Sequence, residues 1–273
     1  MKCAFICVNY NGSQVTSKFV SSVRNLSERA GGAGTVEAII VDNASESHDY
    51  ESLKVLVQDA WEDAKVIRSD VNLGYFGGLN LGLAAIDPRK YDCVIVGNND
   101  LTFDDDFLEK LAEGVYSDDT LVVAPNVITK DGYHQNPHCI TRVSATRKFL
   151  YRLYYLDYCV AQFLTWGANF LKSLKGGRKN LAAHESCFVY MGIGAIYVLR
   201  RGFFEHYSRL DDSVFLYGEE ALLAGQLVAV GGKMYYDSSI VVHHAESATL
   251  SRLPSKKTYD FAKASYPKYR SLL

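Results

Sequence analysis

The sequence predicts an α/β protein built on a doubly wound sheet, mixed but mostly parallel, with helices on its faces. Short apolar runs alternate with segments of helical spacing through the first 100 residues. This alternation is typical of parallel strands joined by crossover helices. Of the 273 residues, 48% are apolar, which is enough to bury a large core and excludes a disordered or low-complexity chain.

The predicted elements follow one another in a regular order. Residues 4–8 form an apolar run that ends at Asn9, as in a strand buried on both faces. Residues 15–26 then repeat apolar side chains at helical spacing. The alternation continues with strands predicted at 36–41, 64–68 and 91–96, and with helices predicted at 50–60 and 77–86. Apolar runs and glycines return between residues 191 and 242, which indicates that the core continues there.

Polar side chains follow three of the predicted strands at the point where each strand ends. They are Asn9 with Asn11, Asp42 with Asn43, and Asn98 with Asn99 and Asp100. Ligands of doubly wound sheets bind beyond the carboxyl ends of the strands, so we expect these groups to share a cleft. Each group also has an ordinary structural explanation, because Asp, Asn and Ser suit helix N-caps and Asx turns.

Residues 72–80 form a glycine-containing loop before a helix. The glycines Gly74, Gly77 and Gly78 would let backbone N–H groups approach a phosphate at the positive end of the helix. The loop matches neither a P-loop nor a dinucleotide fingerprint. A simple turn explains it equally well.

Two further features carry titratable groups. Glu219 and Glu220 follow an aromatic run at the start of a predicted helix, where a carboxylate can act as a general base or simply favour the helix dipole. His243 and His244 are adjacent on a predicted strand, so they point to opposite faces and at most one enters a given site. Either histidine also fits a purely structural role.

The charge distribution is uneven. The chain holds 29 Lys and Arg against 31 Asp and Glu, which argues against a nucleic-acid binder. Residues 141–185 nevertheless hold eight basic residues against two acidic ones, interleaved with aromatic side chains. We expect this segment to be a helical insertion that either binds an anionic membrane surface or packs on the core or a partner. Residues 251–273 form a second basic segment, a C-terminal tail after a domain spanning residues 1–250.

The six cysteines show no C-x-x-C pair, and several lie in apolar runs. We therefore expect reduced thiols and a cytoplasmic protein. The apolar run at the N-terminus is too short for a secretion signal, and no apolar stretch is long enough to span a membrane.

The order of these elements is more specific than any one of them. The sequence resembles family 2 glycosyltransferases with the GT-A fold, in particular the rhamnosyltransferase-like enzymes that build bacterial surface polysaccharides such as O-antigen or capsule. The resemblance covers about residues 1–250. It rests on Val8-Asn9-Tyr10-Asn11, Val41-Asp42-Asn43-Ala44-Ser45, Asn72-Leu73-Gly74 with Gly77-Gly78-Leu79-Asn80, Asn98-Asn99-Asp100, Gly192-Ile193-Gly194-Ala195, Phe215-Leu216-Tyr217-Gly218-Glu219-Glu220, and His243 with Ser247.

The resemblance implies a role for each matching residue. Asp100 would bind Mg²⁺ or Mn²⁺, with His243 as a second ligand, although Asn98 replaces the first acid of the family's D-x-D motif. Glu220 matches the usual catalytic base, and Glu219 remains the other candidate. Nucleotide-sugar binding would fall to Asn9, Tyr10, Asn11, Asp42, Asn43, Asn72, Gly74, Gly77, Gly78, Asn98 and Asn99.

The implied activity is that of an inverting hexosyltransferase in the cytoplasm or at the inner face of the cytoplasmic membrane. It would move a sugar from a dTDP- or UDP-linked donor to a hydroxyl of a glycan or a polyprenyl-diphosphate-linked saccharide. Two other functions remain open at this point: a non-catalytic domain that binds a sugar or a partner protein, and a sugar-phosphate nucleotidyltransferase. The latter would need a basic glycine-rich loop near the N-terminus, and residues 9–13 contain no basic side chain.

Overall fold

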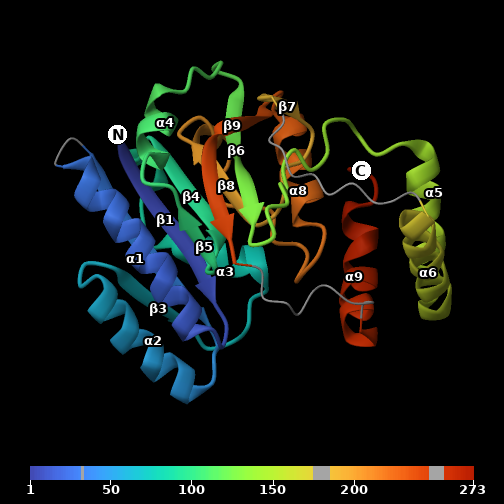
Figure 1. Ribbon diagram of the computed structural model, residues 1–273, viewed down its shortest axis with the longest axis horizontal. Coiled ribbons are helices and arrows are strands. Elements are labelled where there is room, and N and C mark those ends of the chain that lie inside the picture. The colour runs from blue at the N-terminus through green and yellow to red at the C-terminus, as the bar shows by residue number, and fades with distance from the viewer. Residues whose placement is uncertain (32–33, 175–184, 246–254) are drawn as a thin grey trace.

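The computed structural model of the protein describes residues 1–31, 34–174, 185–245 and 255–273. Within these ranges the chain forms a nine-stranded sheet flanked by helices (Figure 1). The strand order is β3-β2-β1-β4-β8-β6-β9-β5, and β7 pairs with β9 beside this path. The mixed α/β sheet expected from the sequence is confirmed.

One half of the sheet is parallel, as the alternation of elements predicts. Its strands are β1 (Lys2–Asn9), β2 (Thr35–Asn43), β3 (Lys65–Ser69) and β4 (Cys93–Asn98). They are connected through α1 (Ser13–Ala30), α2 (Ser47–Ala60) and α3 (Tyr75–Ala84), with a short 3₁₀ turn at Pro88–Lys90. Because Asn9 pairs with Asp42 and the neighbouring Val8 with Asn98, the polar ends of three strands meet at one edge of the sheet.

The other half of the sheet is mixed. Strand β8 runs antiparallel to both β4 and β6, whereas β6 and β9 are parallel. The strands of this half are β5 (Leu101–Phe103), β6 (Thr120–Thr129), β7 (Cys187–Val189), β8 (Ile196–Arg200) and β9 (Lys233–His244). The helices between them are α4 (Phe107–Glu113), α7 (Phe203–His206) and α8 (Glu219–Ala229).

Two apolar layers cover the two faces of the sheet, because successive side chains of a strand point to opposite faces. On β1, Phe5 and Cys7 join the cluster that includes side chains of α1, α2 and α4. Ala4 and Ile6 join the opposite cluster, with side chains of α3, α7 and α8. The apolar run at residues 4–8, predicted to be a strand buried on both faces, is therefore confirmed as one.

A third apolar cluster joins the C-terminal helix α9 (Lys256–Tyr269) to the sheet domain. Its tyrosines Tyr266 and Tyr269 are buried against Ala221 and Leu222 of α8. The part of the predicted basic tail that the structure describes, residues 255–273, is thus packed onto the domain. Residues 251–254 lie outside the described residues.

The basic, aromatic segment that begins at residue 141 forms two helices, α5 (Ala145–Tyr154) and α6 (Tyr158–Leu174). Residues 175–184 of this segment lie outside the described residues. Tyrosine contacts join the helix pair to α9: the rings of Tyr155 and Tyr266 stack at 4.4 Å, and those of Tyr158 and Tyr259 lie 5.3 Å apart. Figure 1 shows α5 and α6 on the far side of α9 from the sheet.

All six cysteines are free thiols in the structure. In the described parts of the chain, no helix combines the length and the apolar character needed to cross a bilayer.

Candidate active site

The polar edge of the sheet opens into a cleft made of two adjoining hollows. The first, of about 570 Å³, reaches from Tyr10 and Asn11 to Asp100, Glu219 and Glu220. The second, of about 590 Å³, lies beside the loop at residues 72–74 and the start of α9. Both hollows are lined by Tyr10, Tyr75, Asn98, Asn99, Leu216 and Tyr217. Residues that follow three strands, Asn11, Asn43 and Asn98 to Asp100, therefore line one cleft.

Asn9 and Asp42 support this cleft from below and do not line it. Both side chains are fully buried. The Asn9 amide donates to Asp42 Oδ1, Ser45 Oγ and Asp49 Oδ2, each at 3.1 Å. The Asn9 carbonyl oxygen accepts from Thr16 at 2.8 Å. Asn9 and Asp42 are thus paired inside the protein, and direct contact of these two side chains with a ligand stays a prediction. They fix the ends of β1 and β2.

Asn43 plays a similar part for the neighbouring loop, although it also lines the second hollow. Its amide donates to Asn72 Oδ1 at 3.1 Å and to the Gly74 carbonyl at 3.0 Å. Its own side-chain oxygen accepts from the Leu73 backbone at 2.9 Å. These three bonds hold the loop that carries Asn72 and Gly74 against the cleft.

The loop passes close to the segment before α8, and this closeness requires a glycine. Gly74 has φ +76°, and a β-carbon there would lie 2.2 Å from the Phe215 carbonyl oxygen. The same Phe215 oxygen accepts from the Tyr75 backbone at 3.1 Å. Gly74 thus lets two walls of the cleft touch.

Gly77 and Gly78 are packing positions in the structure, and their approach to a phosphate stays a prediction. Both are buried within α3. A β-carbon on Gly77 would lie 2.9 Å from Leu73 Cβ, and one on Gly78 would lie 2.9 Å from a methyl group of Val8. Gly78 lets α3 lie close to β1, Gly77 leaves room for the loop before α3, and neither glycine lines the cleft hollows.

Tyr10 and Asn11 follow β1 and line the cleft as expected. The Tyr10 ring is 56% exposed and borders both hollows, so a flat ligand can stack on it. Asn11 has a left-handed backbone (φ +53°). Its position is fixed by its backbone N–H, which donates to Ser45 Oγ at 2.9 Å, and by its side-chain oxygen, which accepts from the Glu46 backbone at 2.8 Å.

Asp100 lies at the first hollow beside a histidine. Its Oδ1 is 3.2 Å from Nε2 of His244, and both side chains are mostly buried. His244 Nδ1 lies 2.8 Å from Gln135 Oε1. His244 Nε2 thus faces both Asp100 and the amide nitrogen of Asn98, which lies 3.3 Å away.

His243 does not reach Asp100. It is half exposed, and its Nε2 lies 2.8 Å from Asp104 Oδ1. Adjacent residues of β9 point to opposite faces, so only one of the two histidines enters the cleft. The structure places His244 beside Asp100 and His243 beside Asp104, so the geometry favours His244 over the predicted His243 as a partner of Asp100.

Glu219 and Glu220 begin α8 and line the first hollow. A tight turn positions them, since Tyr217 and Gly218 both have positive φ. Glu219 is 5% exposed, and its Oε1 has no hydrogen-bond partner in the described chain. Burial and the negative charge of Glu220 raise the pKa of Glu219 to about 7. Glu220 is more exposed, with its carboxylate against the backbone of Gly194.

The carboxylates gather around one tyrosine. Burial, together with the charges of Glu219, Glu220 and Asp100, holds the pKa of Tyr75 well above its usual value. The Tyr75 hydroxyl donates to the Gly194 carbonyl at 2.9 Å. An acid at a strand end and an acid pair at a helix start, more than a hundred residues apart in the chain, therefore face the same space.

Comparison with known proteins assigns the chain to a family. Residues 4–190 match the model of "Glycosyl transferase family 2". This chain belongs to glycosyl transferase family 2. No curated protein matches the sequence closely enough to be counted as a relative.

Solved glycosyltransferases share the fold of this family 2 chain. GalNAc-T7 with UDP, GalNAc and Mn²⁺ has a TM-score of 0.62 at 15% identity, over 98% of this chain and 48% of that one. The mannosyltransferase PcManGT from Pyrobaculum calidifontis, in complex with GDP-Man and Mn²⁺, has a TM-score of 0.56 at 12% identity, over 98% and 62%.

TarS of S. aureus (residues 1–349) has a TM-score of 0.53 at 12% identity, over 90% of this chain and 60% of that one. The GT-A fold is confirmed by these likenesses. The chain spans about half to three fifths of the length of these three structures.

The residues at Asp100 fit a divalent ion that takes most of its ligands from elsewhere. Among the described residues, no group of three or more His, Cys, Asp and Glu side chains forms a metal cage. Asp100 and His244 instead offer a carboxylate and an imidazole nitrogen to one point, 3.2 Å apart. Mg²⁺ in enzymes of this kind keeps waters and is bound through one or two protein ligands and substrate phosphates. Gln135 orients the histidine as an outer partner does in metal sites.

A third hollow, of about 170 Å³, lies on the other side of Glu220. It is lined by side chains of α5 and α9, among them Arg147, Tyr151, Tyr155 and Tyr269. Because Glu220 borders both this hollow and the main cleft, its carboxylate can meet molecules that enter from two directions.

Sequence reasoning missed several residues of this family 2 site. Lys257, Thr258 and Phe261 of α9 line the second hollow, but they lie in the segment that the sequence suggested was a tail. Gln135 and Tyr75 were also missed. Only proximity to His244 and to the acids gives them a role, and no pattern in the sequence shows that proximity.

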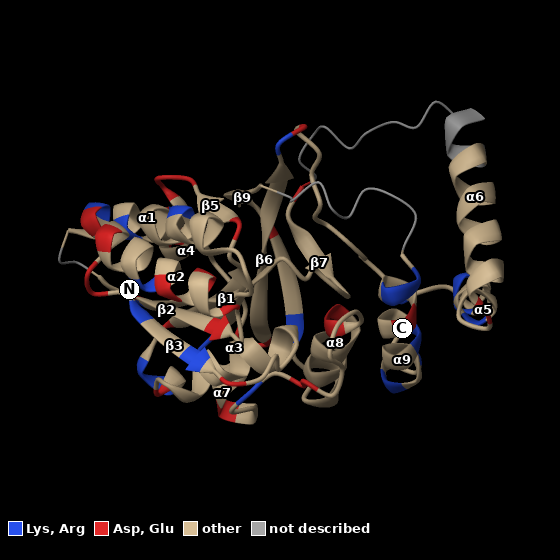
Figure 2. Cartoon of the chain, turned by 90° about the horizontal axis from the view of Figure 1, so that it is seen from below, with Lys and Arg blue, Asp and Glu red and all other residues tan. Residues whose placement is uncertain are grey.

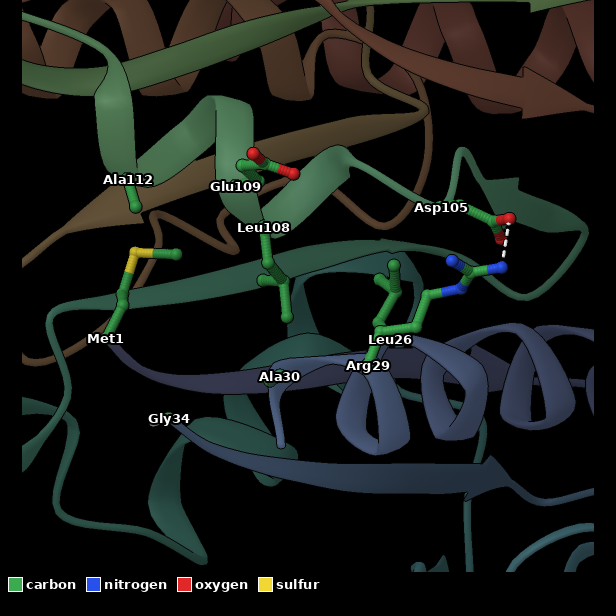
Figure 3. A pocket seen from close by; sticks show the side chains of 9 residues that line it. All are labelled: Met1, Leu26, Arg29, Ala30, Gly34, Asp105, Leu108, Glu109 and Ala112. Carbon is green, nitrogen blue, oxygen red and sulfur yellow. Dashed lines mark hydrogen bonds and ion pairs between the residues drawn. The ribbon is translucent and has the colours of Figure 1, made fainter. Parts of the chain in front are cut away.

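A separate hollow, shown in Figure 3, is lined by the start of β1 and by side chains of α1 and α4 (Met1, Leu26, Arg29, Ala30, Gly34, Asp105, Leu108, Glu109 and Ala112). Across it, Arg29 pairs with Asp105. It lies at the amino end of β1, away from the acids at the carboxyl ends, so we assign it no part in the site.

Proposed function

We propose that this family 2 glycosyltransferase moves a hexose with inversion from a nucleoside diphosphate sugar to a hydroxyl of a saccharide acceptor. The observation that carries the proposal is the shared first hollow, which brings Asp100 with His244 and the pair Glu219–Glu220 to one space. The leaving diphosphate needs a metal site beside it, and the attacking hydroxyl needs a base. The two must lie on opposite sides of the reacting carbon.

The donor would lie along the cleft. The second hollow, with Tyr10, Asn43 and Asn72, offers a flat aromatic surface and amides for a nucleoside. The exposed Lys257 offers the diphosphate a cation. Asp100 and His244 would hold Mg²⁺ or Mn²⁺ next to it. The solved neighbours contain UDP or GDP-Man with Mn²⁺, which supports a nucleotide donor. We propose a UDP- or dTDP-linked sugar.

The acceptor would enter through the third hollow, beside Tyr151, Tyr155 and Tyr269. Aromatic faces suit the apolar faces of sugar rings. The acceptor hydroxyl would then meet the Glu220 carboxylate from the side opposite the donor.

The reaction would be a single displacement. Glu220 accepts the hydroxyl proton while the hydroxyl oxygen bonds to the anomeric carbon and the bond to the diphosphate oxygen breaks. One displacement inverts the configuration. The bound ion would supply Lewis-acid neutralisation of the departing diphosphate. Glu219 is the weaker candidate for the base because its side chain is only 5% exposed, whereas Glu220 borders both hollows.

The resemblance to rhamnosyltransferase-like enzymes supports a place in bacterial surface polysaccharide synthesis, O-antigen or capsule, on a glycan or polyprenyl-diphosphate-linked acceptor. Such an enzyme would work in the cytoplasm or at the inner face of the cytoplasmic membrane. The acids Asp100, Glu219 and Glu220 in one hollow favour sugar transfer over binding alone and over nucleotidyl transfer.

The test is release of nucleoside diphosphate from a panel of donors, with and without candidate acceptors. Transfer predicts release that depends on the acceptor. Glu220→Gln should lower turnover by about 10² to 10⁴-fold while donor binding is unchanged. The proposed base is wrong if Glu220→Gln keeps near-normal turnover and Glu219→Gln loses it.

A further inference from the structure

The helix pair α5–α6 carries an unusual concentration of exposed apolar side chains. In the described chain, large apolar residues exposed by more than a third gather between residues 149 and 170: Phe149, Leu150, Leu156, Val160, Phe163, Trp166 and Phe170. Phe163, Trp166 and Phe170 of α6 are 53–70% exposed. The ring of Trp166 stacks on that of Phe170 at 5.9 Å, so these side chains form one continuous surface.

The exposed apolar residues of α6 form a single stripe along the helix. Val160, Phe163, Trp166 and Phe170 recur at spacings of three and four, which places them on one side of a helix. Ala161, on the opposite side, is fully buried. The stripe therefore faces outward because the other side of α6 packs against the protein.

The charges around the stripe are mostly positive. No charged residue occurs in α6 from Tyr158 to Phe170. Figure 2 shows Lys and Arg on α5 and α9 beside it. On α5 these include Lys148 and Arg152, and the one acidic residue between 141 and 170 is Asp157. An apolar stripe with aromatic side chains and flanking cations is complementary to the headgroup region of an anionic bilayer.

We infer that the exposed stripe of α6, with the basic residues of α5, docks on the surface of an anionic lipid bilayer. Helix α6, Tyr158–Leu174, is about 25 Å long. That length suits a helix lying in the plane of the interface, and it is short of the roughly 30 Å of a bilayer core. A second copy of the chain fits less well, because a symmetric contact on this face would bring the cations of both copies together.

The inference rests on the proposed function in one respect: it names the acceptor class, a saccharide held on a membrane lipid. The hollow beside Glu220 is lined by Arg147, Tyr151 and Tyr155 from α5 and the turn after it. The helix pair that would touch the membrane thus also walls the proposed entry of the acceptor. Docking would present a lipid-linked saccharide at that opening.

The experiment is flotation of the full chain with vesicles of phosphatidylcholine alone and of phosphatidylcholine mixed with phosphatidylglycerol. The wild type should float with the anionic vesicles only. Lys148→Gln with Arg152→Gln should weaken binding by about twentyfold, at about fivefold per cation. Phe163→Ser with Trp166→Ser should weaken it by about tenfold or more. The control is Val115→Ser, which replaces an apolar side chain that is 96% exposed outside the helix pair and should bind as the wild type does.

A second readout locates the contact. The chain has two tryptophans, so in a Trp61→Phe background the emission of Trp166 alone is followed. Anionic vesicles should shift that emission to the blue and expose it to quenching by brominated lipid chains. Unchanged emission, or flotation that survives both sets of α5 and α6 substitutions, would overturn the inference. A dimer that the α6 substitutions dissolve, without vesicle binding, would overturn it in favour of a second copy.

Failure of this inference is separable from failure of the proposed function. Flotation needs no donor, acceptor or metal, so Glu220→Gln should float as the wild type does. Conversely, Phe163→Ser with Trp166→Ser should retain nucleotide binding in solution, because neither residue lines the cleft.

Discussion

Replacing Glu219 with glutamine should change the way in which stability depends on pH. The folded-state pKa of Glu219 is about 7, against 4.5 for an ordinary glutamate. The folded protein therefore holds this proton more tightly than the unfolded chain does. The stability that protonation contributes is fully present below pH 4.5 and is lost as the pH rises through about 7.

The size of the effect follows from the shift. At about 1.4 kcal/mol per pKa unit, ionised Glu219 costs the folded state about 3 kcal/mol at pH 8 and less than about 1 kcal/mol at pH 5. Glu219→Gln removes this cost, because glutamine does not titrate. Any fixed cost of burying the amide is the same at both pH values. The free energy of unfolding of the variant, relative to the wild type, should thus rise by about 2 to 3 kcal/mol between pH 5 and pH 8.

The assay is urea unfolding at pH 5 and pH 8, followed by tryptophan fluorescence. The exposed Glu113 supplies a matched control, since Glu113→Gln should leave the pH dependence unchanged. If the wild type and Glu219→Gln lose stability in parallel between the two pH values, Glu219 does not have a raised pKa, and the reasoning from its burial is refuted.

Three further changes test the cleft. Gly74→Ala should lower the free energy of unfolding by about 2 kcal/mol or more, because its β-carbon would lie 2.2 Å from a backbone oxygen. Gly231→Ala, with φ +70° and no atom near its β-carbon, should cost only about 1 kcal/mol, and equal costs would refute the close contact. Gln135→Leu should weaken Mn²⁺ binding in the presence of nucleotide by about tenfold or more, measured by calorimetry, and unchanged affinity would remove its orienting role. Lys257→Gln should weaken nucleoside diphosphate binding by about tenfold, with Lys256→Gln as the unaffected control, and equal losses in the two variants would argue against a specific contact.

The parallel half of the sheet was predictable because its signal is local. Runs such as residues 4–8 are apolar at every position, which only a strand buried on both faces requires, and the register of parallel strands then brings Asn9, Asp42 and Asn98 to one edge. The sequence could not distinguish residues that contact a ligand from residues that hold the strand ends in place. Asn9 and Asp42 are polar at a strand end whether they face a ligand or each other.

Other parts of the site depend on packing between distant segments. Alternation on a strand predicted that only one of His243 and His244 enters the cleft, but not which one, because that depends on the register of β9 beside β5. The role of Lys257 depends on α9 returning to the cleft, which the buried Tyr266 and Tyr269 bring about. Their spacing of three residues is a signal that a basic tail is a packed helix.

The central claim is that the strand ends form one cleft for a nucleotide and a divalent ion. Calorimetric titration of UDP, dTDP and GDP into the wild type and Asp100→Asn, each with and without Mn²⁺, tests it most directly. The account predicts that at least one nucleotide binds the wild type, that Mn²⁺ tightens this binding, and that Asp100→Asn abolishes the tightening. Binding that is equally tight in the variant, or the same with and without Mn²⁺, would contradict it.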